Sequence, residues 1–171
     1  MDRERAFDAL FRANYAGLCR FAARLLDSPS QAEELVQDLF FWVWQRSPVI
    51  DESTPSRAYL FRAARNAALN RLRHERIGER WFDEQPPSPE VPEVTPATEL
   101  EHIELVAAVA AAIERLPQGC RLVYTLSRQE GLSYHEIASA LELSVKTVEA
   151  QMARAFRLLR QILAPHLPAH Q

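Results

Sequence analysis

The chain has 171 residues, 47% of them hydrophobic, and its formal net charge is -3 at pH 7. This length and composition allow one moderate core or two small ones and exclude a disordered chain. No apolar run reaches the roughly 18 residues that a membrane-spanning helix needs, and the start MDRERAFDALF lacks the apolar core of a signal peptide. We therefore expect a cytoplasmic protein in which Cys19 and Cys120 are buried free thiols.

Apolar residues at helical spacing predict a first helix over residues 3–26. Ser30 and Glu33 then have the spacing of a capping box, in which each side chain bonds a backbone N–H of the first turn. They predict a second helix that ends near Arg46. This helix contains a consecutive apolar run, residues 40–44, that cannot all face one core. Either a partner protein or two neighbouring helices must cover it.

A third helix is expected from Pro55, with Thr54 as its N-cap, to about Arg80. Small and apolar side chains mark its inward face: Leu60, Ala64, Ala67 and Ala68. The opposite face carries polar side chains: Arg62, Arg65, Asn66, Arg73 and Arg76. Seven arginines and two acidic residues lie between residues 57 and 80. Arginine without lysine favours contacts with phosphates or bases, and the alternative is a merely solubilising face.

Residues 82–98 contain five of the eleven prolines and show almost no apolar periodicity. Six acidic residues, and no lysine or arginine, lie between residues 82 and 101. We interpret 82–98 as an acidic linker between two helical domains, residues 1–81 and 99–171. The predicted fold class is therefore all-α, with two small domains.

The second domain is expected to begin with two supporting helices. One runs from Glu99 to about Arg115, and the other from Pro117 to about Gln129. The inward residues of the latter are expected to be Cys120, Val123, Tyr124 and Ser127. Both helices should pack beneath the motif that follows.

Residues 132–163 have the pattern of a helix-turn-helix. Ser133 and Glu136 form a second capping box, which predicts a short helix. Its inward residues have the spacing of one helical face: Tyr134, Ile137, Ala138 and Leu141. Glu142 and Leu143 then form the turn before a longer helix.

Ser144 is the expected N-cap of that longer helix. Its inward residues are apolar or small: Val145, Val148, Met152, Ala155, Phe156, Leu159 and Leu163. Its outward and flanking residues are of types that contact DNA: Lys146, Thr147, Glu149, Ala150, Gln151, Arg154 and Arg157. Lys and Arg donate to guanine or phosphate, Gln pairs with adenine, and Glu accepts from cytosine. The pattern favours a recognition helix, and the alternative is an ordinary solvated face.

The sequence offers no constellation for catalysis. It has no glycine-rich phosphate loop, no Cys/His cluster with metal-ligand spacing and no nucleophile elbow. The five histidines are scattered. We therefore expect no catalytic residue, metal or cofactor, and no enzymatic activity.

Three stretches in this order resemble the extracytoplasmic-function (ECF) group of bacterial RNA polymerase sigma factors, over nearly the full chain. The family's polymerase-binding helix is similar to AEELVQDLFFWVW, and its helix for the proximal promoter element is similar to RAYLFRAARNAALNRLRHER. Its helix-turn-helix for the distal element is similar to LSYHEIASALELSVKTVEAQMARAFRLLR. Three residues depart from the family pattern. Asn70 stands where aspartate is usual, Trp42 where a polar residue is common, and Glu142 where glycine often makes the turn.

The resemblance implies a subunit that binds core RNA polymerase, reads two promoter elements and helps to melt the DNA. Contacts with the clamp of the largest polymerase subunit would come from Glu34, Gln37, Asp38, Phe41 and Gln45. Contacts with the proximal element would come from Arg62, Arg65, Asn66, Asn70 and Arg73, while the loop 47–56 captures a flipped base. The second domain would read the distal element and rest on the polymerase flap. An anti-sigma factor would hold the protein inactive.

Two other interpretations are open. SVKTVEAQM is also similar to the recognition helix of quorum-sensing-type transcription regulators, but residues 1–80 lack the strand alternation expected of such a regulator's N-terminal domain. A helical adaptor protein would use the aromatic run for a partner and would show no promoter dependence.

Overall fold

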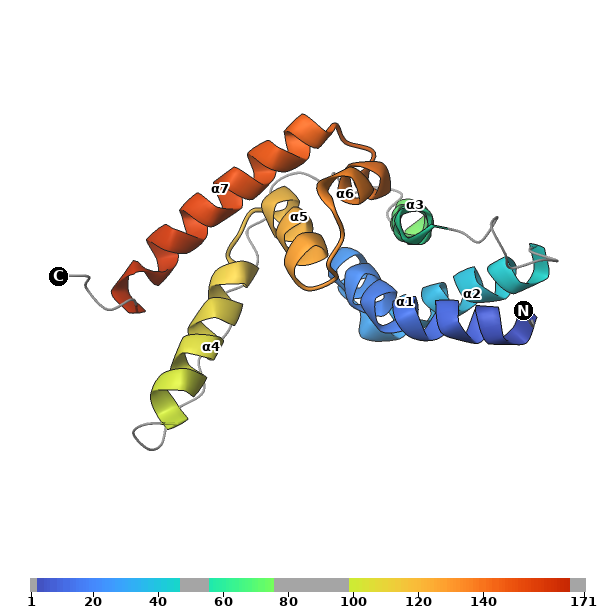
Figure 1. The fold of residues 1–171 in the computed structure, drawn as a ribbon, viewed down its shortest axis with the longest axis horizontal. Helices are drawn as coiled ribbons and strands as arrows, with labels where there is room; N and C mark the ends of the chain where they lie inside the picture. Colours follow the sequence, from blue (N-terminus) through green and yellow to red (C-terminus); the bar gives the residue numbers. More distant parts are fainter. Residues whose placement is uncertain (1–2, 47–55, 76–98, 167–171) are drawn as a thin grey trace.

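The structure is a computed structural model that describes residues 3–46, 56–75 and 99–166. Over these ranges the chain forms seven α-helices and one short 3-10 helix, with no strand (Figure 1). The prediction of an all-α fold is confirmed. Among the helices described, none is long and apolar enough to cross a membrane. The linker 82–98 lies outside the described residues.

The N-terminal module consists of α1 (Arg3–Leu26), α2 (Pro29–Arg46) and α3 (Arg57–Glu75). Helices α1 and α2 pair lengthwise through aromatic rings, with Phe11 and Phe40 at a centroid distance of 4.9 Å. Phe21 of α1 meets Phe61 of α3 edge to face at 5.4 Å. Edge-to-face pairs add to the free energy gained from burial alone, so these contacts fix how the three helices cross.

Two helix starts differ from the prediction. Ser30 lies inside α2, and the Oγ of Ser28 accepts the hydrogen bond from the Gln31 N–H at 3.4 Å. Pro29 is the first helical residue, because it has no N–H that needs a partner there. Helix α3 begins at Arg57, after Ser56, whose Oγ accepts from the Tyr59 N–H at 3.2 Å. The predicted cap Thr54 and Pro55 lie outside the described residues.

The C-terminal module consists of α4 (Glu99–Glu114), α5 (Gln118–Arg128), α6 (Tyr134–Leu141) and α7 (Val145–Leu163), followed by the 3-10 helix Ala164–His166. Helix α7 packs on α4, α5 and α6. A small core joins the end of α4 to α5 and α7: Ala112, Ile113, Leu116, Cys120, Ala155 and Leu159. Cys120 is thus buried, whereas Cys19 is half-buried, and both are free thiols.

Phe156 was predicted to face the core, and this prediction is wrong. The side chain is 37% exposed because it lies at the edge of the apolar stripe of α7. There its ring contacts the edge of Tyr124 at 6.0 Å, and the Arg128 guanidinium lies 5.3 Å from its centroid. Val148, Met152 and the other central members of the predicted stripe are buried.

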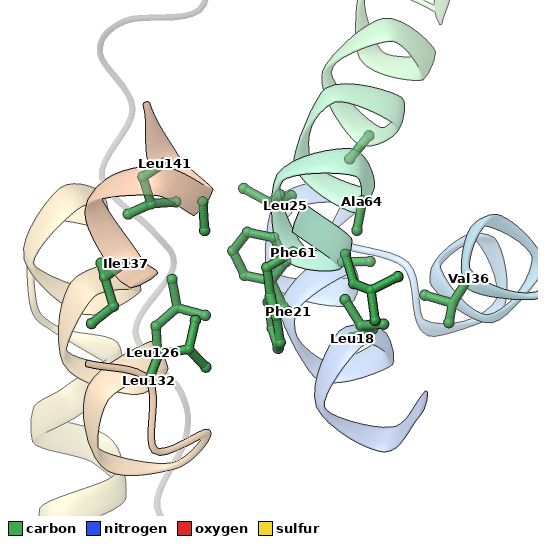
Figure 2. Close-up of a cluster of buried hydrophobic side chains, with 14 of the residues drawn as sticks. Leu18, Phe21, Leu25, Val36, Phe61, Ala64, Leu126, Leu132, Ile137 and Leu141 are labelled. Atoms are coloured by element: carbon green, nitrogen blue, oxygen red, sulfur yellow. The ribbon is translucent and has the colours of Figure 1, made fainter. Parts of the chain in front are cut away.

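The main core is continuous between the two modules. Helix α6 lies against α3, and side chains of both modules meet in one buried cluster (Figures 1 and 2). Figure 2 shows Phe21, Leu25 and Phe61 on one side of this contact, facing the second module. The facing residues are Leu126, Leu132, Ile137 and Leu141. The two modules therefore form one closed body.

Candidate nucleic-acid interface

The helix-turn-helix forms as the capping pattern predicts. Ser133 Oγ accepts from the Glu136 N–H at 3.2 Å, and Glu136 Oε2 accepts from the Ser133 N–H at 2.8 Å, which completes the capping box of α6. Each bond satisfies an N–H that the first helical turn leaves without a partner. Helix α6 ends at Glu142, which is left-handed with φ 56°. A non-glycine residue pays roughly 1–2 kcal/mol for this conformation.

The next helix is capped by Ser144, whose Oγ accepts from the Thr147 N–H at 3.0 Å. The two hydroxyls of Ser144 and Thr147 are also 2.8 Å apart. With Val148 and Met152 buried beneath it, α7 turns a polar face outward. This is the arrangement in which a second helix can enter a DNA groove.

Five of the seven residues predicted to read DNA on α7 are exposed: Lys146, Glu149, Ala150, Arg154 and Arg157. The other two are half-buried and already hydrogen-bonded. Thr147 is bonded to Ser144, and Gln151 Oε1 lies 3.0 Å from the Cys120 sulfur, which donates to it. The amide nitrogen of Gln151 is the part of this side chain left to donate to a base.

The predicted DNA face of α3 is mostly exposed. Asn66, Asn70 and Arg73 are exposed, and Arg62 is half-buried with its guanidinium 5.8 Å from the Tyr59 ring centroid. Arg65 differs, because its side chain is only 25% exposed and its Nη1 lies 3.0 Å from Glu142 Oε2 in the turn of the second module. Arg76 lies outside the described residues.

The residues predicted to bind polymerase form an exposed ridge on α2: Glu34, Gln37, Asp38, Phe41 and Gln45. Phe41 is 62% exposed, and Trp42 beside it is also exposed, whereas Phe40 and Val43 are buried. The apolar run thus faces both inward and outward. Shallow grooves flank the ridge, one between α1 and α2 beside Phe41 and one between α2 and α3 beside Asp38.

Arg71 of α3 is a functional candidate to which the sequence patterns assigned no role. Its guanidinium lies 3.1 Å from Glu34 Oε2 and 3.3 Å from Asp38 Oδ2. These two carboxylates are one helical turn apart on α2, and like charges at that spacing repel each other. Arg71 relieves the repulsion and ties the ridge to α3. The sequence does show that Glu34 and Asp38 lie four positions apart on one helix and need a basic partner. Their spacing does not show which basic residue lies opposite them.

The described side chains hold no group of three His, Cys, Asp or Glu that could bind a metal ion. Burial raises the pKa of the Cys120 thiol, although the nearby charges of Arg154 and Arg157 act in the opposite direction. Burial likewise raises the pKa of Cys19, against a hydrogen bond with Tyr15 that lowers it. Both thiols are therefore poorly suited to act as nucleophiles at neutral pH.

Comparison with known families gives two matches in the order of the two modules. Residues 10–77 match the model for sigma-70 region 2, and residues 107–159 match the model for sigma-70 region 4. The first match spans most of α1–α3, and the second spans the end of α4 to most of α7.

Similar proteins carry the same family name. The ECF RNA polymerase sigma factor SigL of Mycobacterium tuberculosis is 32% identical over 160 residues, which cover 91% of this chain and 87% of SigL. The ECF RNA polymerase sigma factor RpoE of Cereibacter sphaeroides is 30% identical, with 92% and 86% of the two chains covered.

Solved structures agree. CnrH, in its complex with the cytosolic domain of CnrY, superposes with a TM-score of 0.60 at 28% identity, covering 95% of this chain and 90% of CnrH. RpoE of Bartonella quintana, in complex with the anti-sigma factor NepR, shares the fold with a TM-score of 0.62, covering 92% of this chain and 96% of RpoE. The chain therefore belongs to the ECF group of the sigma-70 family and is an RNA polymerase sigma factor that directs promoter-specific transcription initiation.

Proposed function

We propose that this chain binds core RNA polymerase through the exposed ridge of α2 and reads two promoter elements with α3 and α7. The observation that supports this most directly is the exposure of Phe41 and Trp42 beside acidic side chains on one helix. Large exposed aromatic residues next to shallow grooves are typical of protein interfaces. The clamp of the largest polymerase subunit would cover this ridge, and the flap would contact the second module.

The two DNA faces would act together. Arg62, Arg65, Asn66, Asn70, Arg73 and Arg76 would contact the proximal element, and the exposed residues of α7, with Thr147 and Gln151, would contact the distal element. Residues 132–163 contain four basic and three acidic residues, so the helix-turn-helix alone grips phosphates weakly. Polymerase would supply most of the DNA affinity, and the two tethered readers would supply the sequence choice.

We also propose the domain bounds, the location and the absence of catalysis. The functional units are residues 1–81 and 99–171, joined by 82–98. The chain works in the cytoplasm without catalysing a reaction. An anti-sigma factor is the expected regulator, because the structurally similar RpoE was solved with the anti-sigma factor NepR, and CnrH was solved with the cytosolic domain of CnrY.

Transcription in vitro tests the proposal. Core polymerase with and without this chain is given fragmented DNA of the host genome, and the 5′ ends of the transcripts are sequenced. New starts that share two upstream elements at a fixed separation support two readers in one subunit. Starts that share only one element, or no new starts, contradict it.

A further inference from the structure

Gln151 of α7 lies against the start of α5, and its side-chain amide is held there. The Cys120 thiol donates to Gln151 Oε1 at 3.0 Å. The oxygen, the nitrogen and the carbon of the amide all lie 3.6 Å from the position that a Cβ would take on Gly119. The amide group is therefore face-on to the first turn of α5, with its oxygen on the buried side.

The chemistry of this turn favours the amide oxygen over the amide nitrogen. Cys120 is fully buried, and burial raises the pKa of its thiol, so the sulfur keeps its proton and can donate. Helix α5 has Pro117 as its N-cap, which offers no side-chain acceptor to the N–H groups of the first turn. The positive end of a helix attracts an oxygen and repels N–H groups. Reversal of the amide would place two N–H donors against this helix end and a thiol donor.

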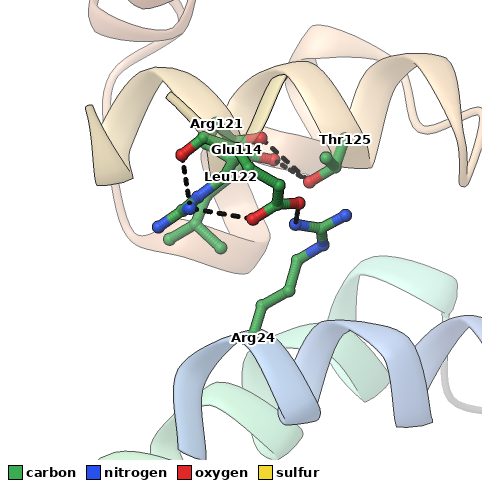
Figure 3. A network of polar contacts seen from close by, with 5 residues as sticks. All are labelled: Arg24, Glu114, Arg121, Leu122 and Thr125. Atoms are coloured by element: carbon green, nitrogen blue, oxygen red, sulfur yellow. Dashed lines mark hydrogen bonds and ion pairs between the residues drawn. The ribbon is translucent and has the colours of Figure 1, made fainter. Parts of the chain in front are cut away.

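The turn that holds Gln151 is itself anchored. Arg121, next to Cys120, donates to the backbone oxygen and to the carboxylate of Glu114 at the end of α4, both at 3.0 Å (Figure 3). The same carboxylate accepts from Arg24 of α1 at 2.7 Å. Cys120 also belongs to the small core that joins α4, α5 and α7. The thiol therefore cannot follow Gln151 if that side chain turns away from α5.

A glutamine held in this way offers a base only part of its hydrogen-bonding capacity. Pairing with adenine needs the amide oxygen to accept from N6 while the amide nitrogen donates to N7. Gln151 Oε1 is turned to the thiol, so the N–H groups are the part that can reach a base. In the major groove guanine presents two acceptors, O6 and N7, whereas cytosine presents a donor. The amide nitrogen thus fits guanine better than adenine or cytosine.

The position of Gln151 on α7 brings this nitrogen to the face proposed to contact DNA. Gln151 is half-buried, and it lies four positions after Thr147 and three before the exposed Arg154. Side chains at these spacings share one side of a helix. A recognition helix contacts base edges with residues near its N-terminus, and Gln151 is in the second turn of α7.

We propose that Gln151 reads the distal element as a hydrogen-bond donor only, with guanine as its base, and that Cys120 is the residue that positions it. This inference rests on the proposed function, because it assigns a base to one residue of the α7 face. It differs from the pairing with adenine that is expected of a glutamine free to turn. Cys120 makes no contact with DNA and acts by keeping Gln151 Oε1 inside the module.

Transcription in vitro from a promoter library tests the assignment. The library carries a promoter at which core polymerase and this chain initiate, with the distal element randomised and each template identified by a transcribed barcode. Gln151→Leu identifies the base pair that Gln151 reads, because the preference at that pair is lost. Wild type should prefer guanine over adenine there by roughly fivefold or more, which is the discrimination expected of a good base contact.

Three further variants test the positioning role. Cys120→Ala removes the donor and frees Gln151 Oε1, so the guanine-to-adenine ratio should fall by roughly fivefold or more. Cys120→Ser keeps an O–H donor and should retain the wild-type ratio. Cys19→Ala is the matched control, because it removes the other free thiol, on α1, and should leave the ratio unchanged. A merely structural role for Cys120 would lower transcription from all templates and would not move this ratio.

The inference and the proposed function fail in different ways. If wild type prefers adenine at this pair, or if no pair loses its preference in Gln151→Leu, the assignment to Gln151 is overturned, while promoter-specific transcription still supports the proposed function. A ratio that is unchanged in Cys120→Ala, or that falls equally in Cys120→Ser, overturns the positioning role. If wild type directs no promoter-specific transcription, the proposed function fails together with the inference.

Discussion

Reversal of the charge at Asp38 should abolish core polymerase binding and leave the fold intact. The Asp38 side chain is 73% exposed, and its carboxylate lies 3.3 Å from Arg71. An ion pair this exposed contributes about 0.2–1 kcal/mol, and a like-charge contact costs a similar amount. For a chain of this length, 1 kcal/mol shifts the melting temperature by about 2–4 °C. Asp38→Arg should therefore melt within a few degrees of wild type.

The effect on binding is expected to be much larger. We expect Asp38 to be a hot spot of this interface, and such residues contribute about 2 kcal/mol or more, which is at least roughly a thirtyfold change in Kd. Titration of fluorescently labelled protein with sigma-free core polymerase measures Kd, and circular dichroism measures melting. Asp8→Arg is the matched control, because it reverses an exposed charge that pairs with Arg12 at 2.9 Å away from the ridge. Wild-type affinity for Asp38→Arg, or melting lowered by many degrees, would refute the reasoning.

Three further predictions concern α6, α7 and Cys120. Arg154→Ala should weaken initiation at the cognate promoter by about 1–3 kcal/mol in run-off transcription if Arg154 bonds a base edge; an equal loss at every promoter would show a phosphate contact instead. Ser133→Ala removes the acceptor of the Glu136 N–H and should lower the free energy of unfolding by about 1 kcal/mol in urea titrations, so an unchanged midpoint contradicts the cap. Because burial raises the pKa of the Cys120 thiol, iodoacetamide should modify it much more slowly at pH 8 in the native chain than in urea, and equal rates would show that the thiol is accessible and unshifted. The pKa of Cys120 is thus higher in the folded chain than in the unfolded chain, where it is about 8.5. Its contribution to the free energy of unfolding is fully present below the unfolded pKa and is lost as the pH rises through the folded pKa.

The features that were predictable from the sequence depend on residues within one or two helical turns. The bounds of α1, the capping box of Ser133 and Glu136, the turn at Glu142 and the cap Ser144 all follow from such local patterns. Local patterns decide less well between competing caps. Ser28 and Ser30 are both candidate caps at the start of α2. The preference of Pro29 for the first helical position makes Ser28 the cap and places Ser30 inside the helix.

Contacts between distant residues could not be predicted. Arg20 and Glu130 are separated by 110 positions, and nothing in either segment indicates the other. Ala140 is likewise fully buried although it lies beside the predicted inward face of α6, because α6 packs on α3 as well as on its own module. Periodicity shows that a helix has an apolar face, but it does not show how many neighbours the helix has.

The same limit applies to the candidate site. The outward face of α7 and its prediction as a DNA-reading surface came from residue types and the helix-turn-helix pattern. The residues of the α2 ridge and their prediction as polymerase contacts came from the family resemblance. The engagement of Arg65 by Glu142, of Gln151 by Cys120 and of Asp38 by Arg71 appears only once the helices are packed. If Arg65 and Asp38 bind DNA and polymerase as proposed, each must exchange its intramolecular partner for the new one.

Competition for core polymerase tests the central claim most directly. Labelled chain is bound to purified sigma-free core polymerase, and an unlabelled sigma factor of the same bacterium is titrated in. We expect tight binding that the competitor displaces completely, because both proteins would use the same clamp surface. Absence of binding at micromolar core polymerase, or binding that the competitor does not displace, would contradict a polymerase-bound role for the ridge of α2.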